Sequence, residues 1–244
     1  MSTKLAEREV AVEGRCVRYR VAGAGDPLVL VHGLAGSTRW WSPMLADLGS
    51  RHTVHLVDLP GFGAMRGWRR FALSGTAVWL LAWMEAAGLA RVSLVGHSMG
   101  AAVVLRAAAS KPDGVDRLVL IAPAGVVTGR SLVGHALPLA EALRRSRPRF
   151  LSVLGMDALR AGPRTLVGAS REVIGDGIRS DLGRVEAPTL VVLGARDTLV
   201  PLEAGAVLSR ELRDARVVVL DRSGHVPMFD EPDELARTLL DFLA

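Results

Sequence analysis

The stretch RVSLVGHSMG, residues 91–100, places the pattern Gly-x-Ser-x-Gly directly after a short apolar strand pattern. From Ala101 onward, apolar side chains recur at helical spacing, so the pattern lies between a predicted strand and a predicted helix. In this setting the two glycines let the strand and helix backbones approach, and the sharp turn exposes the serine hydroxyl. The stretch therefore predicts Ser98 as a nucleophile; the alternative is a serine that only caps the helix.

Short apolar strands alternate with helical patterns on both sides of this stretch. Residues 10–23, VAVEGRCVRYRVAG, predict an antiparallel hairpin with Gly14 at its turn. Alternation of this kind predicts an α/β fold with a mostly parallel central sheet and helices on both faces. Further strands are predicted in PLVLVHG (27–33), TVHLVDLPGFG (53–63), DRLVLIAPAG (116–125), PTLVVLGARD (188–197) and RVVVLDRSGH (216–225). Helices are predicted in RWWSPMLADLG (39–49), around residues 77–84 and 101–108, from about Pro201, and in DEPDELARTLLDFLA (230–244).

The alternation is interrupted after the sixth predicted strand. Residues 124–184 lack strand signals, and their helical pieces are broken by Pro138, Pro148, Gly155 and Pro163. This segment is too short to own a large core, so it predicts a helical cap on a single structural domain. The expected core is residues 1–123 and 185–244, and the expected cap is residues 124–184.

Composition excludes several classes of protein. Of the 244 residues 50% are hydrophobic, which argues against disorder, and only 5% are aromatic. Because Cys16 is the only cysteine, an internal disulfide and a cysteine zinc cage are impossible. The first ten residues are polar and charged, and no apolar run reaches the ~18 residues of a membrane helix. We expect a cytoplasmic protein with no membrane insertion.

The net charge of +5 comes from one segment. Residues 130–184 contain ten arginines and five acidic residues, a local surplus equal to that of the whole chain. Lys4 and Lys111 are the only lysines, and no basic run is interleaved with aromatic residues, so we expect no nucleic-acid partner. The surplus predicts either a solvated surface, which we favour, or a basic cover over an anionic substrate.

A serine nucleophile needs a base and a carboxylate that orients it. His225 follows the last predicted strand and Asp197 the strand before it, and such loops meet at the carboxyl edge of an open parallel sheet. There Asp197 would fix the tautomer of the imidazole. The rival acids fit less well, because Asp58 has the setting of a turn anchor and Asp221 lies too near His225 along the chain. A structural histidine and a turn-forming aspartate are the alternatives.

The order Ser98, Asp197, His225 and five spaced motifs are similar to those of the α/β-hydrolase superfamily. The resemblance covers nearly the whole chain and implies that the backbone N–H groups of Leu34 and Met99 form an oxyanion hole. It also implies a cap that acts as a lid. The motifs are HGLAGS (32–37), DLPGFG (58–63), GHSMG (96–100), LGARD (193–197) and GHVPMFDEP (224–232).

Residues in or near these motifs and residues of the expected cap are candidates for the substrate pocket, although helical spacing also fits a place in the core. They are Gly33, Trp41, Val226, Phe150 and Leu154, with Leu137, Leu143 and Leu151 as further candidates for the roof of the pocket.

We expect a serine hydrolase that cleaves a small-molecule carboxylic ester without a cofactor or metal. A homodimer is a possible assembly. Carbon–carbon hydrolases of meta-cleavage products share DLPGFG and the cap position. They usually have Trp where this chain has Val226 and a glycine-rich loop where it has residues 34–36. A lactonase is a further alternative, and a non-catalytic receptor or scaffold is the alternative from another class.

Overall fold

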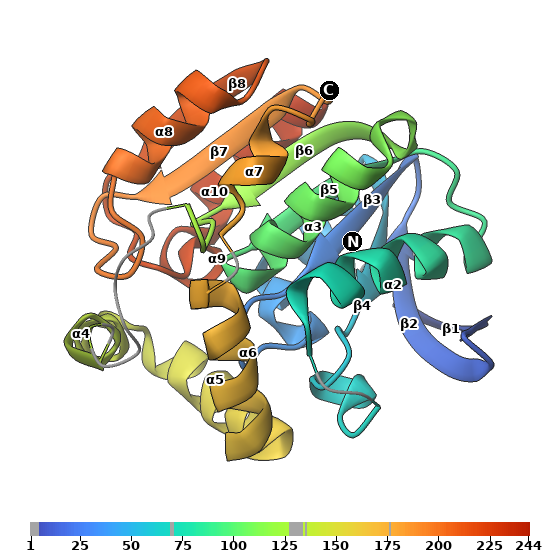
Figure 1. The fold of residues 1–244 in the computed structure, drawn as a ribbon, viewed down its shortest axis with the longest axis horizontal. Helices are drawn as coiled ribbons and strands as arrows, with labels where there is room; N and C mark the ends of the chain where they lie inside the picture. Colours follow the sequence, from blue (N-terminus) through green and yellow to red (C-terminus); the bar gives the residue numbers. More distant parts are fainter. Residues whose placement is uncertain (1–4, 69–70, 127–133, 135, 176) are drawn as a thin grey trace.

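The chain folds around an eight-stranded sheet, seen in a computed structural model that describes residues 5–68, 71–126, 134, 136–175 and 177–244 (Figure 1). The strand order is β1-β2-β4-β3-β5-β6-β7-β8. The pairs β1–β2 and β2–β4 are antiparallel and the others are parallel, which confirms the mostly parallel sheet. The strands are β1 (Ala6–Val12), β2 (Arg15–Gly23), β3 (Asp26–Val31), β4 (His52–Val57), β5 (Val92–His97), β6 (Val115–Ile121), β7 (Thr189–Gly194) and β8 (Ala215–Leu220).

Helices follow the strands as the alternation predicts, with one difference. The segment expected as a helix over residues 39–49 is a 3₁₀ helix, η1 (Thr38–Met44), followed by the four-residue α1 (Leu45–Leu48). Pro43 lies inside η1 and lacks the N–H that an α-helix would use there. The other helices are η2 (Gly63–Met65), α2 (Leu73–Ala86), α3 (Met99–Ser110), η3 (Pro112–Gly114), α4 (Ala136–Arg145), α5 (Pro148–Ala161), α6 (Pro163–Gly175), α7 (Arg179–Leu182), α8 (Glu203–Glu211), α9 (Pro227–Asp230) and α10 (Pro232–Leu243).

The sheet separates two apolar clusters, because successive side chains of a strand point to opposite faces. In β3, Val29 and Val31 belong to the cluster that includes residues of α2, α3 and α8, whereas Leu28 and Leu30 belong to the cluster that includes residues of η1, α9 and α10. Figure 1 shows α2 and α3 in front of the sheet and α10 behind it. Both faces of the central strands are therefore covered, which explains why these strands are apolar throughout.

Helices α4 to α7 occupy the interruption after β6 and connect it to β7. Figure 1 shows α4, α5 and α6 together beside the end of the sheet toward which β6 and β7 point. Residues 127–133, 135 and 176 of the expected cap, with Arg130 among them, and residues 1–4 and 69–70 of the expected core lie outside the described residues. The division into core and cap at the expected boundaries stays a prediction. Within the described ranges, no helix combines the length and the apolar character needed to span a membrane.

Candidate active site

Ser98 occupies a strained turn between β5 and α3. Its φ of 52° and ψ of −113° lie outside the regions that residues with a side chain usually adopt. The glycines on either side have no room for a side chain: a Cβ on Gly96 would lie 2.5 Å from the Gly100 carbonyl oxygen. A Cβ on Gly100 would lie 2.5 Å from the carbonyl oxygen of Val31. The residue types of the motif are therefore those that the local backbone requires.

His225 and Asp197 approach this serine from the last two strands of the sheet, on the far side of β6. Asp197 follows β7 and His225 follows β8, and the two loops are joined by a hydrogen bond from Arg196 N–H to the Ser223 carbonyl oxygen, 2.9 Å. Nδ1 of His225 lies 2.9 Å from Oδ2 of Asp197, and Nε2 lies 3.1 Å from Oγ of Ser98. Because a carboxylate can only accept, Nδ1–H is the donor, which leaves Nε2 free to accept from the serine hydroxyl. The structure thus brings together the three residues that the sequence places in one site.

The carboxylate of Asp197 is fully buried and kept ionised by its partners. Burial acts to raise its pKa, but the charge of His225 and hydrogen bonds from His225, Val200 N–H and Leu199 N–H outweigh burial and lower it. The two backbone donors lie 3.1 and 2.7 Å from Oδ1, so this oxygen is held while Oδ2 faces the imidazole. This arrangement fixes both the charge and the direction of the acid.

His97 supports the loop of His225, a role that the sequence did not reveal. Its Nε2–H donates to the carbonyl oxygen of His225 at 2.7 Å, and the two ring centroids are 5.0 Å apart. Burial is the main cause that lowers the pKa of His97 to about 3, with the neighbouring His225 adding to it. His97 is therefore a neutral donor that fixes the backbone of His225.

Carboxylates near α9 hold the same loop from the other side. Gly224 N–H donates to Oδ2 of Asp230 at 2.8 Å, and Ser223 Oγ donates to Glu231 at 2.8 Å. Both acids belong to the motif GHVPMFDEP, which was the sequence signal for them.

The expected oxyanion hole lies between two tight backbone turns. Met99 is the first residue of α3, where N–H groups have no partner within the helix. Leu34 lies in a turn closed by a hydrogen bond from Gly36 N–H to the Gly33 carbonyl oxygen, 3.0 Å, and Ala35 there has a φ of 59°. The assignment of Leu34 and Met99 as donors stays a prediction.

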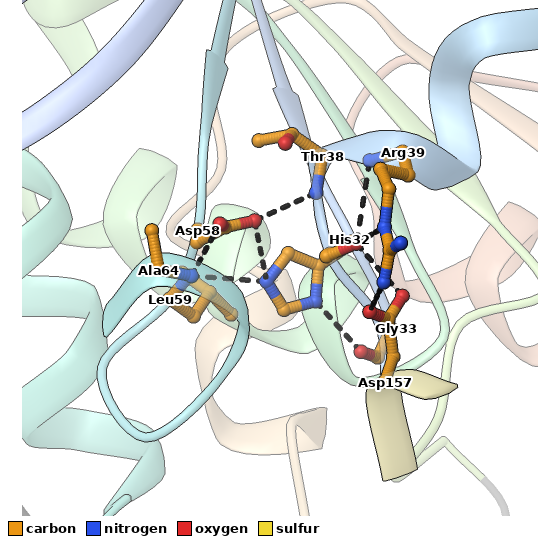
Figure 2. A network of polar contacts seen from close by, with 9 residues as sticks. His32, Gly33, Thr38, Arg39, Asp58, Leu59, Ala64 and Asp157 are labelled. Carbon is orange, nitrogen blue, oxygen red and sulfur yellow. Dashed lines mark hydrogen bonds and ion pairs between the residues drawn. The ribbon is translucent and has the colours of Figure 1, made fainter. Parts of the chain in front are cut away.

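A buried histidine holds the core side of this turn (Figure 2). His32 Nδ1–H donates to the Gly33 carbonyl oxygen at 2.8 Å, and Nε2 accepts from Leu59 N–H at 3.0 Å. Burial lowers the pKa of His32, which agrees with a neutral ring that donates at one nitrogen and accepts at the other.

The two rival carboxylates, Asp58 and Asp221, lie in settings different from that of Asp197. Asp58 accepts from Thr38 N–H at 2.6 Å and from Ala64 N–H at 2.7 Å, as a turn anchor does (Figure 2). Asp221 is exposed. Asp197 is thus the carboxylate that meets His225.

Comparison with known proteins settles the family. A model of the alpha/beta hydrolase family matches residues 28–238. The chain belongs to this family. Its relatives include a pimeloyl-[acyl-carrier protein] methyl ester esterase of Pectobacterium carotovorum, 28% identical over 92% of this chain and 97% of the relative. A 2-hydroxy-6-oxo-6-phenylhexa-2,4-dienoate hydrolase of Comamonas testosteroni is 29% identical over 98% of this chain and 94% of its own length. The crystal structure of a serine hydrolase involved in carbazole degradation superposes with a TM-score of 0.84 and 26% identity, covering 98% of this chain and 99% of that one.

Most of the expected pocket residues of this alpha/beta hydrolase are buried. Gly33 is buried beside the His97 ring, and Val226 is buried next to His225. Phe150 is buried against Trp40, with ring centroids 5.0 Å apart, and Leu154 on the same helix is half-buried. Trp41 is fully buried in the same apolar cluster as Phe150 and Val226, and its neighbour Trp40 is the indole beside His97, with ring centroids 5.7 Å apart.

Helices α4 to α7, called the cap below, expose most of their cations and several leucines. Leu137 is 83% exposed and so does not pack against the core, whereas Leu151 is 38% exposed. The arginines of residues 130–184 that the structure describes are all exposed: Arg144, Arg145, Arg147, Arg149, Arg160, Arg164, Arg171, Arg179 and Arg184. Among the described residues, no group of three His, Cys, Asp or Glu side chains is placed to hold a metal ion.

Proposed function

We propose that the protein is a serine hydrolase that cleaves a carboxylic ester through an acyl-enzyme. The observation that carries this proposal is the unbroken hydrogen-bonded chain from Asp197 through His225 to Ser98 on a strained turn. Relatives whose names describe ester and carbon–carbon hydrolysis, and a likeness to a serine hydrolase, support hydrolytic chemistry in general. Of these reactions, ester hydrolysis is the one that we propose for this protein.

In the first half of the reaction, Oγ of Ser98 bonds to the ester carbonyl carbon while its proton passes to Nε2 of His225. The carbonyl π electrons move to oxygen, and the N–H groups of Leu34 and Met99 stabilise that oxyanion. The carbon–alkoxy bond then breaks, and the alcohol leaves with the proton from His225. Asp197 stays ionised and stabilises the imidazolium.

In the second half, water takes the place of the alcohol. The oxygen of the water bonds to the acyl carbon while His225 accepts a proton from that water. The bond from Ser98 Oγ to the acyl carbon then breaks, the acid leaves, and His225 returns the proton to Oγ. The mechanism needs only groups on this chain and water.

Hydrolysis of p-nitrophenyl esters from acetate to decanoate, with a methyl ester series beside them, tests the proposal. We expect turnover of at least one of these esters, reduced by several orders of magnitude in Ser98→Ala at unchanged thermal stability. Equal turnover by a folded Ser98→Ala variant would contradict it.

A carbon–carbon hydrolase of the meta-cleavage type is the second candidate, favoured by the relative from Comamonas testosteroni. Its substrates are anionic, whereas the described cap arginines are exposed, which favours a neutral ester. A vinylogous diketo acid should therefore be cleaved more slowly than a neutral ester of similar size. Faster cleavage of the diketo acid that collapses at high salt, where charge attraction is screened beyond ~8–10 Å, would favour the second candidate.

A further inference from the structure

Helix α5 of the cap meets the core through one face. Its two buried residues are Phe150 and Asp157, which are seven positions apart and therefore lie on the same side of the helix, two turns from each other. Both reach the segment that begins at Ser37: Phe150 packs edge-on against Trp40, and Asp157 binds Ser37 and Arg39. The cap thus packs on the residues that directly follow the turn carrying Leu34.

Asp157 is an unusual residue at such a contact, because it is a carboxylate with only 1% of its surface exposed. Oδ2 accepts from Ser37 Oγ at 2.7 Å, and Oδ1 accepts from the guanidinium of Arg39 (Figure 2). A buried carboxylate is costly unless it is paired and hydrogen-bonded, and here each oxygen has a partner. Both partners come from the core segment, so the charge is satisfied only when the cap is docked there.

Ser37 connects this contact to the turn beside the nucleophile. It follows Leu34 by three residues and caps η1, where its Oγ also accepts from Arg39 N–H at 3.4 Å. The turn between them is strained at Ala35, whose φ is 59°, so it needs its ends to be held. His32 holds the core end, and Asp157 holds the cap end through Ser37.

We propose that Asp157 is a positioning residue for the oxyanion hole: it fixes the turn that carries Leu34 N–H and makes that geometry depend on a docked cap. The inference rests on the proposed function, in which Leu34 N–H stabilises the oxyanion. Asp157 touches neither Ser98 nor His225, and it acts on turnover through Ser37.

The test compares Asp157→Ala, Asp157→Asn and Ser37→Ala with the matched control Glu141→Gln. Glu141 is also a cap carboxylate with arginine partners, Arg144 and Arg145, but it lies on the outer helix α4 away from η1. With the best p-nitrophenyl ester, Asp157→Ala should lower kcat about 10- to 100-fold, less than the loss of a whole oxyanion donor. KM should change less than about threefold, and Glu141→Gln should match the unmodified protein.

An aryl trifluoromethyl ketone gives a readout that cap stability alone would not move. Ser98 Oγ adds to its carbonyl carbon, the proton passes to His225, and the adduct carries an oxyanion. Its inhibition constant should rise in parallel with the fall in kcat, while that of the product acid should not. Asp157→Ala and Ser37→Ala should not be additive, because they remove the same hydrogen bond.

The outcomes separate this inference from the proposed function. If the unmodified protein shows no Ser98-dependent turnover, the proposed function fails and the inference fails with it. If turnover is Ser98-dependent but Ser37→Ala and the Asp157 variants behave like Glu141→Gln, the inference alone is wrong. Should Asp157→Ala not fold, Ser37→Ala decides, because it leaves Asp157 paired with Arg39.

Discussion

The carboxyl edge of the sheet and the cap are built in different ways. At the edge, each group of the site is held in place: Ser98 by its turn, Asp197 by two backbone N–H donors, and the loop of His225 by the side chains of His97 and Asp230. In the cap, α4 buries no residue, and Leu159 of α5 is 81% exposed.

Because of this difference, the reacting groups and the attachment of the cap are fixed by different parts of the molecule. The groups proposed to react are fixed by the same strands and loops that form the core, so their geometry is determined when the core folds. The cap is attached by buried apolar residues of α6 and α7, which belong to the core cluster, and by α5, where the Asp157 contact is polar and buried. We therefore expect changes at the edge to alter turnover most and changes on the outer cap to alter little.

The largest expected effect is on turnover at the edge. Asp197→Asn keeps the shape of the side chain but no longer fixes the Nδ1–H tautomer of His225, and should lower kcat by up to ~10⁴-fold. Asp221→Asn is the matched control, since Asp221 is exposed and only four residues from His225. Steady-state kinetics at equal thermal stability decides. An Asp221→Asn variant as impaired as Asp197→Asn would show that the wrong carboxylate has been chosen.

The next effect compares stability in the two regions. Leu94→Ala removes a fully buried side chain of β5 and should lower the free energy of unfolding by about 2–5 kcal/mol. Leu159→Ala removes an exposed side chain of α5 and should change it by less than about 0.5 kcal/mol. Urea unfolding measures both. Similar losses in the two variants would mean that the outer cap is packed as tightly as the core.

The third effect is a pH dependence of stability at the edge, small over any one pH unit. The folded protein protonates His97 only near a pKa of about 3, whereas the unfolded chain protonates it near 6.5. Between these values the unfolded state binds more protons, so the free energy of unfolding falls as the pH falls from 6.5 toward 3.

His97→Gln keeps an N–H donor for the His225 carbonyl but does not titrate. Its unfolding free energy should fall less steeply with decreasing pH, by at most about 1.4 kcal/mol per pH unit. Urea unfolding at several pH values measures the slopes. Parallel slopes in the two proteins would show that His97 is not a source of the acid sensitivity.

The sequence was sufficient to predict the parts of the fold that rest on local patterns. Apolar alternation predicted each of the central strands, and the turn around Ser98 follows from glycines that neighbour it in the chain. The meeting of Asp197 and His225 followed from a general property of parallel sheets, whose carboxyl ends share one edge. In the segment 39–49, which follows the first parallel strand, Pro43 is the sequence feature that argues against a regular α-helix.

Contacts that join distant parts of the chain could not be predicted in this way. His97 binds the backbone of His225 across 128 residues, and Asp157 binds Ser37 across 120. No periodicity encodes such pairs, because each depends on how the helices and loops finally pack. Asp157 looks like an ordinary exposed acid in an arginine-rich segment until α5 is seen on η1.

Labelling with a fluorophosphonate tests the central claim most directly, because only an activated serine displaces the fluoride. Intact-mass spectrometry should show one phosphonyl group per chain, and peptide mapping should place it on Ser98. Ser98→Ala should stay unlabelled, and Asp197→Asn should be labelled far more slowly. An unlabelled wild-type protein, or equal labelling of Ser98→Ala, would contradict the account.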